Sequence, residues 1–301
     1  MVTSVNLCGV ELKNPVVPAS GTFGFGLEAS SFYDINCLGG ISLKGTTLEP
    51  RFGNECPRIA ECPGGMINSV GLQNPGVKVL VGEKIPALRK IYGGVVIANV
   101  SGFSIEEYEK CCSAVSASPG VDIIEVNVSC PNVHGGGLAF GTDASTAAEV
   151  TRVVKKVSTK PVFIKLSPNV TDIVAIARAC EDAGADGLTL INTILGMRID
   201  IRRRKPVVAN KYGGFSGRAV LPVALRMVNQ VRNACSLPIM GCGGVSCASD
   251  VLEMMMAGAT AVQVGAENLR NPMVCSDIVK ELPLLMEELH IENINEIIGI
   301  V

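Results

Sequence analysis

The chain has 301 residues, of which 48% are hydrophobic and 18% are charged, and its net charge is −2 at pH 7. This balance offers no electrostatic basis for binding nucleic acid or an anionic membrane. No apolar run approaches the roughly 20 residues that span a bilayer, and Met1 to Lys13 lack the basic start and apolar stretch of a signal peptide. We therefore expect a cytoplasmic protein.

Twelve cysteines are present, but none are spaced as a C-x-x-C pair. In a cytosolic chain of this size we expect reduced thiols rather than disulfides. The missing cluster spacing also argues against an iron–sulfur cluster or a structural zinc site within this chain. With only two histidines, we expect no metal site.

Short apolar segments alternate with helical patterns along the chain. Eight of them are predicted strands: residues 15–19, 40–43, 95–99, 123–127, 162–166, 187–192, 239–241 and 261–264. The helices expected between them include residues 105–116, 146–157, 173–183, 219–234 and 248–256. Buried, non-alternating strands separated by helices predict a parallel sheet. A closed (β/α)8 TIM barrel spanning residues 1–301 as one domain is the favoured fold, with an open doubly wound sheet as the alternative.

Three segments interrupt this alternation. Residues 5–7 and 10–12, around Gly9, predict a small N-terminal hairpin that plugs the bottom of the barrel. Residues 53–75 and 197–217 are expected to be irregular insertions after the second and sixth strands. Insertions at the C-terminal face of a barrel usually wall or cover the active site.

Glycine-rich turns follow the last two predicted strands, at Gly241 to Gly244 and at Gly265. They could merely be tight turns. Their paired positions, however, match the phosphate site of barrel enzymes, where backbone N–H groups meet an anion. Because no G-x-G-x-x-G fingerprint follows the first strand, the pattern favours a cofactor such as FMN over a dinucleotide.

Two lysines lie at predicted strand ends, Lys44 and Lys165. Such residues are often solvated, but a lysine at the rim of an apolar barrel is costly without an anionic partner. Lys165 could stabilise negative charge on a reduced flavin, and Lys44 could bridge flavin and substrate. Lys165 could alternatively form a Schiff base, as in barrel aldolases.

Four carboxamides fall in the predicted rim: Asn68, Asn127, Asn132 and Asn192. A single asparagine there is usually a turn residue. Four together offer donors and acceptors that suit a flat ring of alternating C=O and N–H groups, such as a pyrimidine. The turn Ser69-Val70-Gly71-Leu72 could add backbone donors for a carboxylate.

Cys130 precedes Pro131 in a polar, glycine-rich loop. It could be another buried thiol, but this loop offers an inert core residue little to pack against. A thiolate with a pKa near 8.5 can take an activated proton, so we predict that Cys130 is the catalytic base. Residues 131–141 are a candidate lid.

Together these residues resemble the dihydroorotate dehydrogenases over nearly the whole chain. The motifs that carry the resemblance are Ser20-Gly21, Lys44-Gly45-Thr46, Asn68-Ser69-Val70-Gly71-Leu72, Asn127-Val128-Ser129-Cys130-Pro131-Asn132, Asn192-Thr193, Gly214-Phe215-Ser216-Gly217 and Gly241-Cys242-Gly243-Gly244. Cysteine rather than serine at position 130 resembles class 1, the cytosolic class. The segment from His134 to Asp143 is similar to the B subfamily, the catalytic subunit of the NAD-linked enzyme. The fumarate-using A subfamily typically has a Pro-Gly-Lys-Pro-Gln-type sequence there.

The resemblance implies a role for each matching residue. Cys130 would remove the C5 proton of dihydroorotate while the C6 hydride passes to the flavin. The residues implied in substrate binding are Lys44, Asn68, Ser69, Val70, Gly71, Leu72, Asn127, Asn132, Asn192 and Thr193. Those implied in FMN binding are Ser20, Lys44, Gly45, Asn99, Asn127, Lys165, Ile191, Gly217, Gly243, Gly244, Gly265 and Ala266. Position 266 is commonly threonine in the family, but one lost hydroxyl bond costs only about 1 kcal/mol, so we expect FMN to be retained.

The resemblance also implies partners. A separate subunit would carry FAD and a [2Fe–2S] cluster and pass electrons to NAD, in a heterotetramer built on a homodimer of this chain. Three other functions stay open: a flavin-dependent dihydropyrimidine dehydrogenase acting on uracil or thymine, a Schiff-base lyase using Lys165, and a non-catalytic flavin scaffold. We expect the basic run from Arg202 to Lys205 to be a solvated flap rather than a docking patch.

Overall fold

The computed structural model describes residues 1–129 and 140–301. Eight parallel strands form one sheet, in the order β3-β16-β15-β10-β9-β8-β7-β4. Their bounds are β3 Val16–Pro18, β4 Gly40–Ser42, β7 Val95–Val100, β8 Ile123–Asn127, β9 Val162–Lys165, β10 Gly187–Leu190, β15 Ile239–Cys242 and β16 Ala261–Val264. Each overlaps one of the eight predicted strands, which confirms that prediction.

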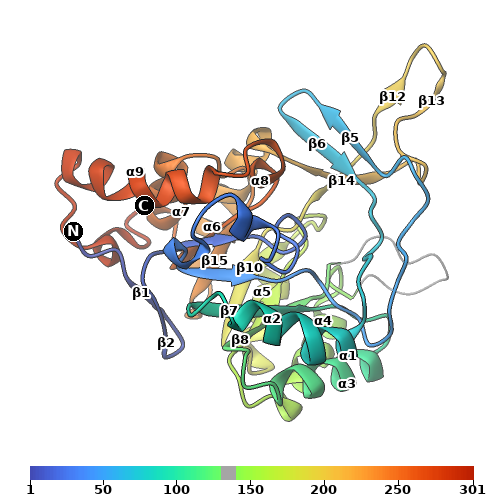
Figure 1. Cartoon of the computed structure of the whole chain (residues 1–301), viewed down its shortest axis with the longest axis horizontal. Coiled ribbons are helices and arrows are strands. Elements are labelled where there is room, and N and C mark those ends of the chain that lie inside the picture. The colour runs from blue at the N-terminus through green and yellow to red at the C-terminus, as the bar shows by residue number, and fades with distance from the viewer. Residues whose placement is uncertain (130–139) are drawn as a thin grey trace.

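The first and last strands of this order meet and close the sheet. The backbone N–H of Gly39, just before β4, donates to the carbonyl oxygen of Val16 in β3 at 3.1 Å. The result is the predicted (β/α)8 TIM barrel (Figure 1), and the open doubly wound alternative is wrong.

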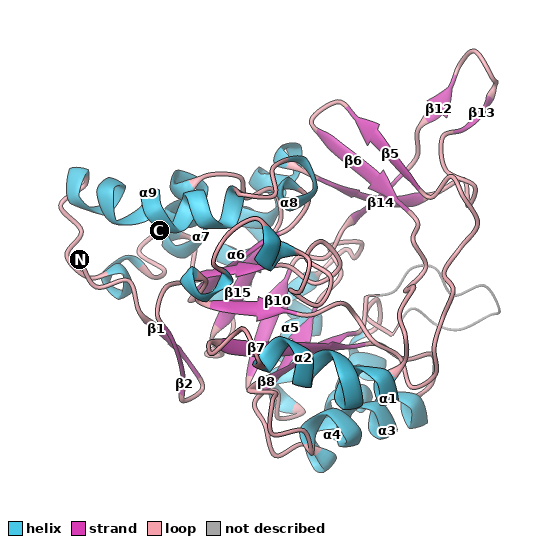
Figure 2. Ribbon diagram, viewed as in Figure 1, coloured by secondary structure: helices cyan, strands magenta, loops and turns pink. Residues whose placement is uncertain are grey.

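Helices surround the barrel (Figure 2). The α-helices are α1 Val77–Val79, α2 Ile85–Arg89, α3 Ile105–Ser116, α4 Ala144–Val157, α5 Ile173–Asp182, α6 Leu221–Arg232, α7 Ala248–Met256, α8 Glu267–Arg270 and α9 Val274–Glu288. Short turns of helix are η1 Ala29–Ser31, η2 Ile35–Cys37, η3 Leu80–Lys84, η4 Arg218–Val220 and η5 Ile294–Ile297. None of the helices in the described ranges is both long and apolar enough to pass through a membrane.

Side-chain caps set where several of these helices begin. Ser104 accepts a hydrogen bond from the N–H of Glu107, Asp143 from that of Thr146, and Asp172 from that of Val174. Such caps satisfy backbone donors that have no partner within the helix. The five predicted helices correspond to α3, α4, α5, α6 and α7.

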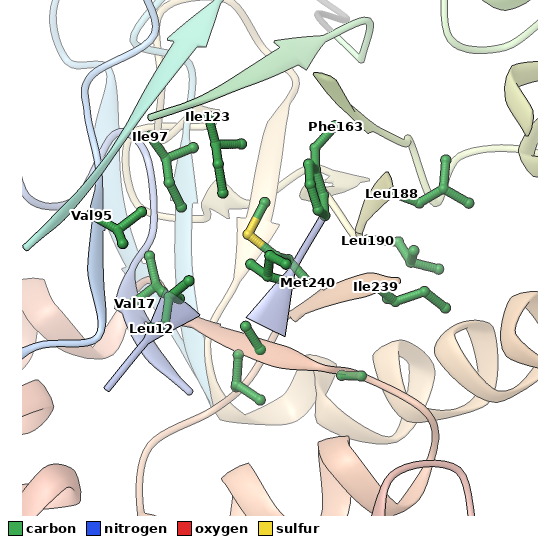
Figure 3. Close-up of a cluster of buried hydrophobic side chains, with 14 of the residues drawn as sticks. Leu12, Val17, Val95, Ile97, Ile123, Phe163, Leu188, Leu190, Ile239 and Met240 are labelled. Carbon is green, nitrogen blue, oxygen red and sulfur yellow. The ribbon is translucent and has the colours of Figure 1, made fainter. Parts of the chain in front are cut away.

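The N-terminal hairpin is present, as predicted, with strands β1 Val5–Leu7 and β2 Val10–Leu12. Leu7 and Leu12 are fully buried, and Figure 3 shows Leu12 beside Val17 of the barrel. The hairpin therefore contributes apolar side chains to the core that fills the barrel.

The barrel interior is built in layers, to which alternate strands contribute side chains. We define the apolar layer as Val17, Ile97, Phe163 and Met240, which Figure 3 shows gathered together. The strand registers place a polar layer directly above it, on the side of the strand C-termini: Ser42, Glu125, Thr189 and Gln263. All eight side chains are fully buried.

The two insertions form a second sheet, so the expectation that they are irregular is wrong. Its order is β11-β14-β6-β5, with β5 Ile59–Cys62, β6 Gly65–Asn68, β11 Ile194–Gly196 and β14 Gly213–Ser216. A further hairpin, β12 Ile199–Asp200 and β13 Lys205–Pro206, projects beyond it (Figure 1). The basic run from Arg202 to Lys205 lies exposed at that hairpin.

Candidate active site

A pocket opens at the C-terminal face of the barrel, between the strand ends and the second sheet. Residues at or just after the C-terminal ends of all eight barrel strands line it. The predicted site residues found in its wall are Ser20, Lys44, Gly45, Asn68, Val70, Gly71, Leu72, Asn99, Asn127, Lys165, Ile191, Asn192, Thr193, Gly217, Gly243, Gly244, Gly265 and Ala266. Ser69 is not part of this wall; it is fully buried, and its N–H donates to the carbonyl oxygen of Arg58. Cys130 and Asn132 lie outside the described residues.

The glycine turns form one end of the pocket. Gly243 and Gly244 have φ of 128° and 83°, a region that favours glycine. A Cβ atom on Gly244 would lie 2.4 Å from the backbone nitrogen of Leu221, at the start of α6. The short helix α8 begins at Glu267, next to Gly265 and Ala266. Turns after the seventh and eighth strands beside a short extra helix are the usual phosphate site of this fold.

Carboxamides form another part of the pocket wall. The Oδ1 atom of Asn127 accepts from the Nδ2 of Asn192 at 3.1 Å and from the N–H of Ser129 at 3.0 Å. Asn68 lies at the end of β6, where its Nδ2 donates to the carbonyl oxygen of Gly214. These contacts hold three amides from separate strands in fixed orientations. Among the described residues, none is hydrogen-bonded to the NH2 group of Asn127 or the Oδ1 of Asn68, so these groups can serve as a donor and an acceptor for a bound ring.

Lys165 lies between these two ends, at the base of the pocket. It is 5% exposed, and its Nζ donates to the Oε1 of Gln263 at 2.9 Å and lies 3.6 Å from the Oε1 of Glu125. Lys44 lines the pocket near Gly21, where a Cβ atom would lie 3.9 Å from its Nζ.

The charge of Lys165 is set by these buried neighbours. Burial by itself lowers its pKa, whereas the nearby Glu125 carboxylate raises it, and the net pKa lies above the ordinary lysine value. Burial also raises the pKa of Cys242, so this thiol stays neutral and Glu125 supplies the counter-charge. A protonated amine is a poor nucleophile, so this environment disfavours the Schiff-base lyase.

Glu125 and Gln263 were missed by the sequence reasoning. Each is a polar residue inside an otherwise apolar strand, and that signal could have identified them. The pocket also has apolar wall residues that were not predicted: Ile59, Met66, Val220 and Leu269. Their contribution depends on how the insertions and α8 fold over the barrel.

The pocket fits a phosphorylated, planar, polar-edged cofactor. Glycine turns suit its phosphate, and apolar side chains face its ring. The Oδ1 of Asn99 is buried and accepts no hydrogen bond from the described residues. This atom lies 2.7 Å from where a Cβ on Gly45 would be, so it faces the pocket wall. A buried acceptor without a partner is costly, and the N–H of a ring would satisfy it.

A barrel with a phosphate turn, a buried cation and converging amides defines a class of barrel enzymes that bind a phosphorylated cofactor beside a polar substrate. Over residues 2–286 the chain matches the family described as dihydroorotate dehydrogenase. It is 54% identical over 296 residues to a protein of Geobacillus kaustophilus, covering 98% of this chain and 94% of that protein. It is 52% identical over 295 residues to one of Enterococcus faecalis, covering 98% and 95%. Both are called dihydroorotate dehydrogenase B (NAD(+)), catalytic subunit.

The chain therefore belongs to the dihydroorotate dehydrogenase family. Membership makes it an oxidoreductase of pyrimidine biosynthesis that oxidises dihydroorotate, and it implies a flavin cofactor.

Proposed function

We propose that residues 1–301 form one FMN-binding domain, which oxidises dihydroorotate to orotate in the cytoplasm as the catalytic subunit of an NAD-linked enzyme. The observation that carries the proposal is the continuity of one pocket. It joins the glycine turns at Gly243 and Gly265 to the amides of Asn68 and Asn127, with Lys165 between them. A cofactor phosphate and a pyrimidine ring thus have complementary surfaces in the same cavity.

The phosphate end of the pocket favours a phosphorylated flavin such as FMN over riboflavin. The turns at Gly243, Gly244 and Gly265 have no bulk at Cβ, so the backbone N–H groups can approach an anion closely. Bound there, FMN supplies the acceptor for the hydride that leaves C6 of dihydroorotate. The residues that would hold its ring are Lys165, Asn99 and Gly45, and Ile191 and Gly217 would flank it.

The amide wall would recognise the substrate ring. Asn127 offers its NH2 group and Asn68 its Oδ1, so their hydrogen bonds distinguish ring carbonyl oxygens from ring N–H groups. Gly71 and Leu72 have φ of 76° and 56°, a turn whose backbone N–H groups would meet the C6 carboxylate. Uracil and thymine lack this carboxylate, so the turn favours dihydroorotate over them.

Cys130 is the proposed base. It would take the C5 proton as the hydride leaves C6, which forms the C5=C6 double bond of orotate. The residue before it is held in place: the Ser129 hydroxyl donates to the carbonyl oxygen of Lys165 at 2.8 Å, and its N–H donates to Asn127. These bonds tie the end of β8 to both the amide wall and Lys165.

The electron acceptor is proposed from the relatives. Their name contains both NAD(+) and catalytic subunit, which supports a second subunit that carries FAD and a [2Fe–2S] cluster. We propose a heterotetramer built on a homodimer of this chain. Purification with such a partner, and NAD reduction only in its presence, would support this; turnover with fumarate by the isolated chain would contradict it.

The reaction is tested with Cys130→Ala. The variant is expected to purify yellow, but anaerobic dihydroorotate should bleach its flavin at least about a hundredfold more slowly, the usual contribution of a general base. Stopped-flow absorbance measures the rate. Cys8→Ala is the matched control, because Cys8 is an exposed cysteine outside the pocket wall. Bleaching of Cys130→Ala at the wild-type rate would refute the role of Cys130.

A further inference from the structure

Glu125 is a fully buried carboxylate that does not line the pocket, yet it contacts the polar groups beneath it. Its Oε1 accepts from the Nδ2 of Asn99 at 2.6 Å and from the Ser42 hydroxyl at 3.2 Å. Its Oε2 accepts from the Nε2 of Gln263 at 2.6 Å. No step of the proposed reaction uses Glu125. A buried charge without such partners would be strongly unfavourable. The Glu125 carboxylate therefore accepts every hydrogen bond of this network, and each neighbouring group must turn a donor toward it.

This requirement fixes the Gln263 amide. An ionised carboxylate only accepts hydrogen bonds, so the NH2 group of Gln263 must face Glu125 and its oxygen must face away. This oxygen accepts from the Lys165 ammonium at 2.9 Å. Glu125 thus acts on Lys165 twice, directly across 3.6 Å and through the orientation of Gln263.

The same carboxylate fixes the Asn99 amide. Because the NH2 group of Asn99 donates to Glu125, its Oδ1 is turned toward Gly45 and the pocket wall. The pocket therefore presents a cation at Lys165 and an acceptor at Asn99. A flavin has a matching edge: N1, which carries the negative charge of the reduced form, is followed around the ring by the C2 carbonyl group and then by the N3–H group.

We propose that Glu125 is a positioning residue for the flavin, which keeps Lys165 cationic beneath the ring and turns the oxygen of Asn99 toward it. The proposal rests on the FMN site proposed above. It assigns a function to a carboxylate that touches neither cofactor nor substrate.

The groups that face Lys165 determine its protonation state once Glu125 loses its charge. Within residues 1–129 and 140–301 they are Glu125 from β8, Cys242 from β15 and Gln263 from β16. Gln263 is neutral, and burial keeps Cys242 a neutral thiol. Without the carboxylate, burial remains the dominant influence, and it lowers the pKa of Lys165. Lys165 would then lose its proton within the accessible pH range and regain it when the flavin is reduced.

The test is the pH dependence of the flavin reduction potential in Glu125→Gln holoenzyme. Above neutral pH, reduction of the variant should take up one more proton than reduction of the wild type. For each rise of one pH unit, the equilibrium constant for flavin reduction in the variant should fall tenfold more than in the wild type. This corresponds to a further decrease of about 30 mV in the two-electron reduction potential. Its FMN dissociation constant should rise about tenfold, the loss of about one hydrogen bond.

Two matched variants isolate the effect. Asp186→Asn also converts a carboxylate beside a lysine to an amide, but its partner is Lys155, away from the pocket; it should keep the wild-type potential at every pH. Glu125→Asp keeps the charge and should restore the wild-type slope. A Glu125→Gln holoenzyme with the wild-type slope and FMN affinity would overturn the proposal.

Glu125→Gln could also fail to hold FMN, because it leaves Lys165 as a buried cation without a counter-charge. The double variant Glu125→Gln, Lys165→Met removes both charges, and exchanging a buried ion pair for neutral groups is often tolerated. It should regain the wild-type fold and stability, which denaturant unfolding measures, even though it lacks the contact of Lys165 with FMN. If the stability is not regained, Glu125 acts independently of Lys165 and the proposal is wrong.

Failure of the FMN proposal is separable from failure of this one. Wild-type protein that purifies without FMN would refute the cofactor. The titration of Lys165 can still be followed by NMR with labelled lysine, in wild type and in Glu125→Gln. An unchanged Lys165 pKa in the variant would refute the role of Glu125 whatever cofactor is bound.

Discussion

The apolar and polar layers of the barrel are equally buried but opposite in chemistry. Phe163 of β9 belongs to the apolar layer, whereas Lys165, two residues further along the same strand, carries a charge and contacts Glu125 and Gln263 of the polar layer. A Cβ atom on Gly187 would lie 2.2 Å from the Phe163 ring, so the apolar layer is tightly packed. The polar layer is instead held by hydrogen bonds around Glu125. Along β9, the residue that stabilises the core and the residue that faces the cofactor site are therefore only two positions apart.

A comparison of two ion pairs of the barrel shows the same contrast. The Nζ of Lys155 lies 2.5 Å from the Oδ2 of Asp186, and these side chains are 28% and 30% exposed. The Nζ of Lys165 lies 3.6 Å from the Oε1 of Glu125, and both side chains are almost completely buried. Water competes for the first pair and weakens it. The longer contact therefore has the larger influence, because there is little solvent to replace it.

The largest stability effect is expected in the apolar layer. Phe163→Ala should reduce the free energy of unfolding by about 3–5 kcal/mol, because it leaves a cavity against Gly187. Denaturant unfolding measures this loss. The folded variant should still contain FMN, because Phe163 does not line the pocket.

Phe52→Ala is the control, since Phe52 is 95% exposed and its removal should change stability by less than about 0.5 kcal/mol. Loss of FMN from Phe163→Ala while its stability is unchanged would break the separation of the two layers.

A smaller effect is expected at the phosphate end. Gly244→Ala places a side chain at a residue whose φ is 83°, and this strain should lower the free energy of unfolding by an amount on the order of 1–3 kcal/mol. The added methyl group would also collide with the backbone of Leu221. FMN should be lost on gel filtration, which absorbance at the flavin band measures. Gly82→Ala is the control: Gly82 lies in η3 with no atom within 4 Å of its would-be Cβ. It should be neutral or stabilising by about 0.5–1 kcal/mol. Equal FMN loss in both variants would exclude a specific role for Gly244.

The smallest effect is expected for the exposed ion pair. Asp186→Asn should lower the free energy of unfolding by no more than about 1 kcal/mol, with flavin content and potential unchanged. A double-mutant cycle with Lys155→Met measures the coupling between the two side chains. A coupling much larger than this would mean that partial exposure does not weaken the pair.

The barrel could be predicted from the sequence because its strands are locally marked. Each is a short, mainly apolar run, and polar or glycine residues come at its end or just after it, at the rim. The residues of the pocket wall could be predicted for the same reason, since parallel strands bring their C-terminal ends to one face. Lys165 and Asn127 are examples, and both line the pocket.

The second sheet and the Glu125 network could not be predicted in the same way. β6 and β14 are short and contain glycine, and they pair with each other across the two insertions, with Gly214 opposite Asn68. Glu125 meets Gln263 only because the barrel closes, 138 residues apart in the chain. Neither contact leaves a local pattern, although a charged residue inside an apolar strand does indicate that a partner must exist.

The second sheet has a consequence for loop engineering. The insertions after β4 and β10 share one register: Met66, Ile67 and Asn68 pair with Ser216, Phe215 and Gly214. A Cβ on Gly217 would lie 2.4 Å from the Cα of Gly65, so even the end of this pairing has no spare room. If only one insertion were replaced by that of a relative, the pairing between β6 and β14 would be disturbed, and Asn68 would lose its position opposite Gly214. The two segments are one transplantable unit and must be exchanged together.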